Sequence, residues 1–260
     1  MAPPKPSSRL AMTDLHCHLL PGLDDGAKTP EISLEMARMA IRCGVRQIVC
    51  TPHCTTGDPG LPQRLTRIEK AVGVLNYVLG QMQLPITLHA GTELLCNDRL
   101  PETLANGEFL TLAGSRYLLV EFPFDVPLSR IEWAANTVRQ AGYIPVLAHP
   151  ERYTAVWRNP DCLAVWFFAG YVIQLDKDSV LGRFGSHCAC TADWALRHGV
   201  AHVIASDAHD TKTRTTNLER ARQYVAQNYS PGYADLLVSR NPARIVRHEA
   251  LLGQNGESAR

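Results

Sequence analysis

Short apolar runs alternate along the chain with longer segments in which apolar residues recur every three or four positions. The short runs fit buried strands and the longer segments fit helices that cover them, because side chains share a face every two residues in a strand and about every 3.6 in a helix. We expect strands at Met12–His18, Gln47–Thr51, Ile86–Ala90, Tyr117–Val120, Ile144–Ala148, Tyr171–Leu175 and Ala201–Ala205. This alternation predicts a parallel α/β architecture of roughly seven strand–helix units.

The helix after the first strand has recognisable start and stop signals. Thr29 is expected to cap a helix that begins at Pro30 and stops at Gly44. Its buried stripe is predicted to consist of Ile32, Met36, Met39 and Cys43. Further helices are expected at about 63–83, 129–141, 161–169 and 187–198, and the chain is expected to be helical from about Asn217.

The length of the chain suits one large domain. An α/β barrel takes about 250 residues, and the chain has 260. We expect a single domain over residues 11–250, a disordered leader over 1–10 and a flexible tail over 251–260. The leader contains proline and serine but no apolar core, so it does not fit a secretory signal.

Charge and cysteine content argue against several kinds of partner. A net charge of +1 gives no reason to expect nucleic-acid binding, and no apolar run approaches the roughly 18 residues of a membrane helix. Eight cysteines are too few for a disulfide scaffold, which agrees with a cytoplasmic location. Cys188 and Cys190 form a C-x-C pair that we interpret as buried helix cysteines, with a redox or zinc site as the alternative.

Ionisable and metal-binding side chains follow the predicted strands at the points where the strands end. They are His16 and His18, His53, Glu93, Glu121, His149 with Arg152, and Asp207 with His209. In a barrel of parallel strands these ends meet at one mouth, where such folds carry their chemistry. Burying so many charged groups unpaired would cost several kcal/mol each, whereas a shared metal cluster accounts for all of them with one cause.

The candidate ligands are too numerous for a single ion. Five imidazoles (His16, His18, His53, His149 and His209) join four carboxylates (Asp25, Glu93, Glu121 and Asp207). Zinc takes about four ligands and octahedral ions take six, so these nine predict two or three clustered ions. Such ions favour hydroxide over water and bind an anionic oxygen substrate.

Two arginines add fixed positive charge that suits a phosphate. The guanidinium groups of Arg152 and Arg214 match paired phosphate oxygens, so we predict metal-assisted hydrolysis of a phosphate ester. Each residue alone has a simpler explanation: Glu121 as a salt-bridged strand end, Arg152 as a structural cap, Arg214 as a solvated loop residue. Asp14 is expected to orient one of the histidines.

Other histidines and the cysteines are assigned no chemistry. His89, His187, His198, His202 and His248 have no converging partner and are interpreted as packing or surface residues. A cysteine-dependent phosphatase needs an arginine six residues after its nucleophile, and no cysteine in the chain has one.

The order and spacing of these motifs resemble a known superfamily over about residues 13–246. The motifs are His16-Cys17-His18, Asp24-Asp25-Gly26, Thr51-Pro52-His53, Glu93, Glu121-Phe122, Ala148-His149-Pro150-Glu151-Arg152-Tyr153 and Ala205-Ser206-Asp207-Ala208-His209. They resemble the polymerase-and-histidinol-phosphatase (PHP) superfamily. Leu181-Gly182-Arg183-Phe184-Gly185 and Asn241-Pro242-Ala243-Arg244-Ile245-Val246 are similar to its bacterial protein-tyrosine phosphatases, the CpsB/YwqE group associated with capsule and exopolysaccharide synthesis.

This resemblance implies a distorted (β/α)7 TIM-like barrel, the PHP fold, that holds three divalent ions. Manganese is the expected metal, with iron, zinc, cobalt or magnesium as alternatives. By position, the first ion takes His16, His18, Glu93 and Asp207. Glu93 bridges to a second ion completed by Glu121 and His149, and the third takes Asp25, His53 and His209. Arg152 and Arg214 fall where the family binds phosphate.

The resemblance also implies a substrate, the phosphotyrosine tail of a bacterial tyrosine autokinase. A small-molecule phosphatase acting on a compound like histidinol phosphate is the alternative, and a catalytically silent regulatory module is another. His209 and Asp210 are candidates for a general acid. Two segments depart from the family pattern, Gln174–Ser179 and Cys54–Gly57, and both are expected on loops at the mouth, where they bear on substrate preference.

Overall fold

The computed structural model describes residues 10–253. The predicted leader and tail therefore lie outside the described residues, apart from Leu10 and 251–253. The strands are β1 Met12–Cys17, β2 Val45–Cys50, β3 His53–Thr55, β4 Thr87–Ala90, β5 Glu93–Leu95, β6 Tyr117–Glu121, β7 Ile144–Ala148, β8 Val172–Asp176 and β9 Val203–Ala205.

Helices occupy most of the intervening chain. They are α1 Pro30–Arg42, α2 Leu61–Gln81, α3 Leu100–Ala105, α4 Leu128–Gln140, α5 Thr154–Arg158, α6 Cys162–Phe168, α7 Lys177–Val180, α8 Ser186–Arg197, α9 Glu219–Asn228, α10 Pro231–Asp235 and α11 Asn241–Val246. Three short helical turns, η1 Leu112–Gly114, η2 Pro150–Arg152 and η3 Leu236–Arg240, complete them. None of the helices in residues 10–253 has the length and apolar character needed to cross a membrane.

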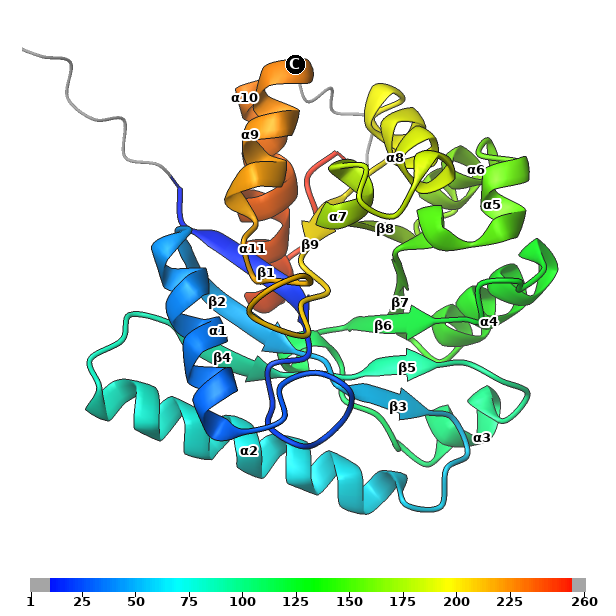
Figure 1. Cartoon of the computed structure of the whole chain (residues 1–260). Coiled ribbons are helices and arrows are strands. Elements are labelled where there is room, and N and C mark those ends of the chain that lie inside the picture. Colours follow the sequence, from blue (N-terminus) through cyan, green and yellow to red (C-terminus); the bar gives the residue numbers. More distant parts are fainter. Residues whose placement is uncertain (1–9, 254–260) are drawn as a thin grey trace, which may run out of the picture.

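The strands form a closed parallel barrel with seven strand positions among the described residues (Figure 1). Two of these positions are each split in two: β2 leads into β3, and β4 leads into β5. The strand orders are β1-β2-β4 and β3-β5-β6-β7-β8-β9. The first and last strands close the ring, because the His18 amide donates to the Ala208 carbonyl at 2.8 Å and the Asp207 amide to the His16 carbonyl at 2.9 Å. The predicted α/β barrel is confirmed.

Proline accounts for one of the two strand breaks. Pro52 has no amide hydrogen, so it cannot donate to a neighbouring strand. The ladder stops after Cys50 and resumes at His53, which pairs with Glu93 on β5. The break brings two predicted metal ligands next to each other at the mouth.

The core has an inner part inside the barrel and an outer part between strands and helices. Leu15, Val49, Leu119 and Val146 belong to the inner part, which Ile245 of α11 joins. The C-terminal helix therefore packs against the inner core from the end of the barrel opposite the strand C-termini. The predicted metal ligands lie at the other end, beside the C-termini of the strands.

Helix α1 begins as predicted but packs on a slightly different face. The Thr29 hydroxyl accepts from the Ile32 amide at 3.4 Å, and Pro30 is the first helical residue. Of the predicted stripe only Met36 is buried, alongside Ser33, Ala37 and Ala40. Small side chains face the sheet because they allow the helix to approach it closely, so the larger Ile32, Met39 and Cys43 lie at the edges of the contact.

The segment Gln174–Ser179 is buried rather than on a loop at the mouth, so that prediction is wrong. Strand β8 continues to Asp176, and α7 follows at once with all four of its residues buried. The Lys177 ammonium pairs with Asp178 at 2.6 Å, and Arg183 pairs with the same carboxylate at 2.9 Å. Lys177 and Asp178 tolerate burial because each has a charged partner inside the protein.

Candidate metal centre

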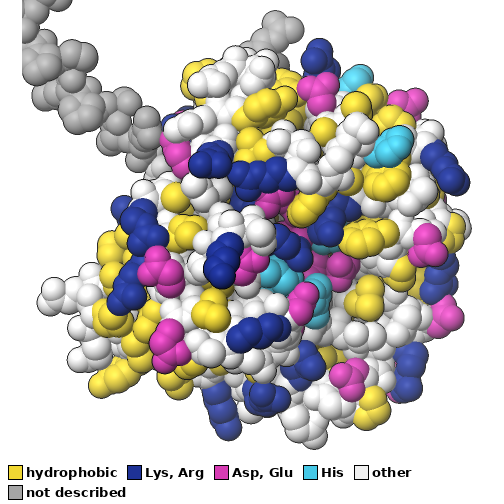
Figure 2. Space-filling view, in the orientation of Figure 1, with side chains coloured by type: hydrophobic (Ala, Val, Ile, Leu, Met, Phe, Trp, Pro, Cys, Tyr) yellow, Lys and Arg dark blue, Asp and Glu magenta, His cyan; other side chains and the backbone are white. Residues whose placement is uncertain are grey.

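The barrel mouth gathers all nine side chains that the sequence suggests as metal ligands. His16 and His18 come from the end of β1, Asp25 from the loop that follows, and His53, Glu93 and Glu121 from β3, β5 and β6. His149 follows β7, and Asp207 and His209 follow β9. Histidine and acidic side chains cluster at the centre of this face, with lysine and arginine side chains around them (Figure 2).

Three overlapping groups have ligand atoms within 4.8 Å of one another, the spacing that a bound ion requires. They are His16, His18, Glu93 and Asp207; His18, Asp25, His53 and His209; and His53, Glu93 and Glu121. The first group has the membership expected for the first ion. The second contains the three residues expected for the third ion, with His18 in addition.

The group around Glu121 differs in one member from the set expected for the second ion. His53 takes part in it, with Nδ1 2.9 Å from Glu93 Oε2 and 3.4 Å from Glu121 Oε2. His149 Nε2 lies 3.1 Å from Glu93 Oε1 and 3.7 Å from Glu121 Oε1, so it borders the same carboxylates. The assignment of His149 to the second ion stays a prediction.

Two of these residues have an unusual backbone conformation. His149 has φ 34° and Asp207 has φ 46°, in the left-handed region that residues with a side chain rarely adopt. Such positions cost about 1–3 kcal/mol each and concentrate at functional sites. His149 directly follows β7 and Asp207 lies two residues after β9, and the turn at each position aims the side chain at the centre of the mouth.

Hydrogen bonds fix the orientation of the two β1 imidazoles. His16 Nδ1 bonds to Gln174 Oε1 at 2.9 Å, and His18 Nδ1 bonds to Asp24 Oδ2 at 2.7 Å. In each ring Nε2 is then left to face Glu93 and Asp207. Partners of this kind are found behind most metal-binding histidines. Sequence reasoning missed both roles, although Asp24 stands in the quoted Asp24-Asp25-Gly26 motif.

Asp14 does not contact a histidine ring, contrary to the expectation for it. Its Oδ1 accepts from the Ser206 amide at 3.0 Å and from the His16 amide at 3.4 Å. It therefore ties β1 to the turn after β9 through the backbone. Asp14 orients the strand that carries His16, while Gln174 orients the ring.

Gly26 is required by the close approach of the loop after β1. A Cβ atom at this position would lie 2.1 Å from the His18 carbonyl oxygen and 2.4 Å from the His18 Cβ. The next amide, of Ala27, donates to that same carbonyl at 3.0 Å. The glycine lets the loop fold back over His18, which places Asp24 behind the ring and Asp25 in front of it.

The pKa values of the side chains in the cluster depend strongly on one another. Burial alone would raise the pKa of Glu93, but the neighbouring charge of His16 and hydrogen bonds from the surrounding imidazoles hold that pKa well below its usual range. Burial would lower the pKa of His53, yet hydrogen bonds to Glu121 and Glu93 raise it to about 10. Burial and the charge of His18 lower the pKa of His209 to about 4. Glu93 is therefore anionic and attracts positive charge into the cluster.

Buried polar atoms in the cluster indicate that these residues fit divalent ions. Glu93 Oε2, although 2.9 Å from His53 Nδ1, and His209 Nε2 are buried atoms that make no well-oriented hydrogen bond, and buried polar atoms of this kind normally make one. Both point into the cluster, where a cation would satisfy them. A mixed set of imidazole nitrogens and carboxylate oxygens suits manganese, iron, zinc or cobalt.

Both predicted phosphate-binding arginines lie beside the cluster. Arg152 NH1 is 2.9 Å from Asp207 Oδ2, and Arg214 NH2 pairs with the same oxygen. Arg152 is only 17% exposed. Its guanidinium group contacts the rings of Phe124 and Phe184. The simpler explanations, a structural cap and a solvated loop residue, do not account for two guanidinium groups meeting at one candidate ligand.

The remaining histidines pack as expected. His187, His198 and His202 stack on Trp157, Trp194 and Phe167 respectively. His89 bonds to Gln47 at 3.2 Å and His248 to the Ala113 carbonyl at 3.1 Å.

The cysteines lack the features of a nucleophile. Burial raises the pKa of Cys54 and Cys162 to about 12 and that of Cys188 to about 11. Cys188 is buried as predicted, whereas Cys190 on the same helix is exposed, so the interpretation of the pair as buried is half wrong. A raised pKa disfavours the thiolate that nucleophilic attack requires.

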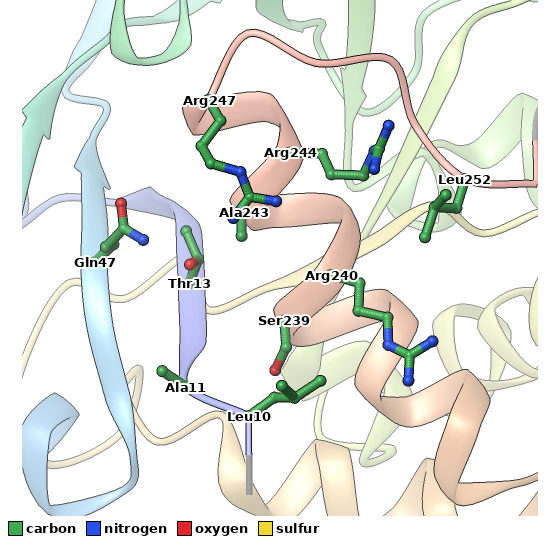
Figure 3. A pocket seen from close by; sticks show the side chains of 10 residues that line it. All are labelled: Leu10, Ala11, Thr13, Gln47, Ser239, Arg240, Ala243, Arg244, Arg247 and Leu252. Atoms are coloured by element: carbon green, nitrogen blue, oxygen red, sulfur yellow. The ribbon is translucent and has the colours of Figure 1, made fainter.

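A cavity at the opposite end of the barrel offers a poorer site. It measures about 390 Å³ and is bordered by the start of β1 and by Arg240, Arg244 and Arg247 (Figure 3). The three guanidinium groups point in different directions rather than at a common centre. Glu249 already pairs with Arg244 and Arg247.

Known proteins resemble the chain over nearly its whole length. Residues 12–247 match a family described as capsular polysaccharide synthesis, CpsB/CapC. The chain is 32% identical to the tyrosine-protein phosphatase YwqE of Bacillus subtilis (strain 168), over 94% of each chain. It is 27% identical to the tyrosine-protein phosphatase CpsB of Streptococcus pneumoniae, over 92% of this chain and 100% of that protein.

A solved structure supports the same comparison. It comes from work on YwqE of Bacillus subtilis and CpsB of Streptococcus pneumoniae, described as unique metal-dependent tyrosine phosphatases. It superposes with a TM-score of 0.84 at 31% identity and covers 93% of this chain and 96% of that one.

Proposed function

Because the chain belongs to the CpsB/CapC family of capsular polysaccharide synthesis proteins, we propose that it is a metal-dependent protein-tyrosine phosphatase. The observation that carries this proposal is the convergence of nine ligand-type side chains and two arginines at one barrel mouth. Its relatives are named tyrosine-protein phosphatases. We propose His16, His18, Asp25, His53, Glu93, Glu121, His149, Asp207 and His209 as the ligands of three divalent ions, with manganese as the expected metal.

Divalent ions held by these residues would supply Lewis acidity and would activate water for attack, which is the usual metal contribution to phosphate ester hydrolysis. The chain itself supplies position and charge. Arg152 and Arg214 bind the phosphate oxygens and stabilise the charge that develops on them as the ester bond breaks. Gln174 and Asp24 hold the His16 and His18 rings in one orientation.

Asp210 acts on the loop rather than on the substrate. Its two carboxylate oxygens accept from the amides of Lys212 and Thr213 and from the Thr213 hydroxyl, each at 2.6 Å. These bonds fold the segment that carries Arg214, so Asp210 is not a proton donor to the leaving group. A tyrosine phenol has a pKa of about 10 and leaves with less help from an acid than an alkoxide does.

We further propose that the substrate is the phosphotyrosine-bearing tail of a bacterial tyrosine autokinase. The setting would be the cytoplasm, where the free cysteines would stay reduced. Dephosphorylation of such a tail would regulate capsule or exopolysaccharide synthesis, in keeping with the family's description.

The test is turnover of a phosphotyrosine peptide by protein reconstituted with Mn²⁺, Fe²⁺, Zn²⁺, Co²⁺ or Mg²⁺, with histidinol phosphate as the competing substrate. We expect the peptide to be hydrolysed faster and a chelator to stop the reaction. Faster turnover of histidinol phosphate would establish a small-molecule phosphatase instead. A metal-loaded protein with no turnover of either compound would be a silent regulatory module.

A further inference from the structure

Two phenylalanine rings flank the predicted phosphate-binding arginine at the mouth. The Arg152 guanidinium carbon lies 4.7 Å from the centroid of the Phe124 ring and 4.7 Å from that of the Phe184 ring. Phe124 follows Glu121 on the loop after β6, and Phe184 precedes α8. The two rings come from distant parts of the chain and meet at one guanidinium group.

Phe124 is an exposed aromatic residue at the barrel mouth. It is 48% exposed, although burying a phenyl ring fully is worth about 1.5–3 kcal/mol. Its ring lies 6.4 Å from that of His149, a predicted metal ligand. Of the large apolar side chains exposed within residues 10–253, it is the one with ring contacts to both Arg152 and a predicted ligand. Small-molecule sites combine aromatic surfaces with a few precisely placed polar groups, and the Phe124 ring beside Arg152 and His149 has this combination.

Both loops are held in place by hydrogen bonds. The Phe124 carbonyl accepts from the Thr154 amide at 2.8 Å, which ties its loop to the helix after Arg152. The Arg183 amide donates to the Asp178 carbonyl at 2.8 Å, and the Arg183 side chain pairs with the Asp178 carboxylate at 2.9 Å. The rings are thus supported before any ligand arrives, which limits the entropy lost on binding.

We propose that Phe124 and Phe184 form the binding site for the aromatic ring of the substrate and give this phosphatase its selectivity for aryl over alkyl phosphate esters. An ester whose phosphate is held by Arg152 has its organic group next to these rings. The phenyl group of phosphotyrosine is flat and apolar and packs against them, whereas the short alkyl linker of phosphoserine or phosphothreonine offers little surface. The inference rests on the proposed phosphatase function.

This role fits the unusual segment after His53, of which Cys54 and Thr55 belong to strand β3 rather than to the predicted loop. The segment Cys54-Thr55-Thr56-Gly57 contains no aromatic residue, so it provides no stacking surface for a phenyl ring. The loops after β6 and before α8 provide that surface instead.

A different role for the rings would be to hold Arg152 and nothing more. In that case their removal would weaken every phosphate ligand equally, because the guanidinium contacts the phosphate whatever group is attached. Aryl recognition, by contrast, changes only the binding of ligands that carry a ring. The two roles are separated by comparing one ligand with a ring and one without.

The experiment is calorimetric titration of the Mn²⁺-loaded protein with benzylphosphonate and with methylphosphonate, neither of which can be hydrolysed. We expect wild type to prefer benzylphosphonate. Phe124→Ala and Phe184→Ala should each reduce that preference roughly 3- to 10-fold, the range of an aromatic pair contact, with methylphosphonate binding unchanged. Phe124→Leu keeps most of the volume and should reduce the preference even if the alanine variant does not fold.

Phe168→Ala is the matched control, because this ring is 84% exposed on α6 and touches only Phe167 among the aromatic rings of the described chain. It should leave both affinities unchanged. Equal weakening of both phosphonates in the Phe124 and Phe184 variants would overturn the inference, as would equal binding of both by wild type. Wild type that shows the preference but hydrolyses no phosphotyrosine peptide would overturn the proposed function and leave aryl recognition standing.

Discussion

Replacing Gln174 by leucine should weaken metal binding without altering any proposed ligand. Gln174 is fully buried on β8, and its Oε1 is 2.9 Å from His16 Nδ1. The Gln174 amide group also donates to the Leu175 carbonyl at 3.2 Å, which fixes its oxygen toward the imidazole. Nδ1 of His16 therefore carries the proton, and Nε2 is free to bind an ion.

Leucine has nearly the volume of glutamine, so the change removes the hydrogen bond with little cavity. A buried donor left without a partner costs about 1–3 kcal/mol. Loss of the hydrogen bond behind a metal-binding histidine typically lowers metal affinity about 10- to 100-fold, which corresponds to about 1.4–2.7 kcal/mol. The first range applies to the stability of the metal-free protein and the second to its affinity for Mn²⁺, so the two effects are measured separately.

The assay is calorimetric titration of the metal-free protein with Mn²⁺, accompanied by urea denaturation without metal. Gln47→Leu is the matched control, because Gln47 bonds to the ring of His89 at 3.2 Å, outside the candidate metal centre. We expect weaker binding for Gln174→Leu and wild-type affinity for Gln47→Leu. Mn²⁺ affinity within twofold of wild type in Gln174→Leu would refute the role assigned to Gln174.

Three further predictions concern the metal centre, the cysteines and a buried histidine. The double variant His53→Ala/His149→Ala should fold but lose phosphatase activity at least about 100-fold, because losing each ligand should cost no less than the roughly 10-fold typical of losing a hydrogen-bond partner behind a ligand; a wild-type rate would contradict the site assignment. Chelation should abolish activity and thiol alkylation should leave it intact, since burial raises the pKa of most cysteines. Burial lowers the pKa of His202 to about 3. His202 should therefore destabilise the fold as pH falls below about 6.5, because the unfolded chain then binds a proton that the folded chain does not. Between pH 7.5 and 5.5 this contributes about 1.4 kcal/mol, measured as the difference in urea stability between wild type and His202→Gln; equal losses in the two proteins would argue against it.

Much of the barrel was predictable because its signals are local. The strand Ile144–Ala148 and the start of α1 at Pro30 follow from apolar runs and caps, and the structure has them at the expected residues. The short strands β3 and β5 were missed, because three residues contain too little pattern to be recognised. They exist because neighbouring strands are already in place to pair with them.

Most of the candidate ligands were predictable for the same reason, since they stand at or near strand ends that can be recognised in the sequence, whereas Asp25 lies on the loop after β1. Their supporting partners were not. Gln174 is far from His16 in the sequence, and the register of β8 against the rest of the barrel decides that they meet. The polar segment Asp176–Ser179 was predicted to be a surface loop, because the sequence alone does not show that Lys177 and Asp178 pair with each other inside the protein.

The closure of the barrel between β1 and β9 has a consequence for the order of events during synthesis. The seam joins the segment of His16 and His18 to that of Asp207 and Ala208. One side of the candidate centre is therefore synthesised early in translation and the other side late. A ribosome that has completed β1 through β8 has produced six strand positions and no finished site. If the proposed ligand set is right, the growing chain gains its full metal-binding capacity only when its last strand emerges and closes the ring.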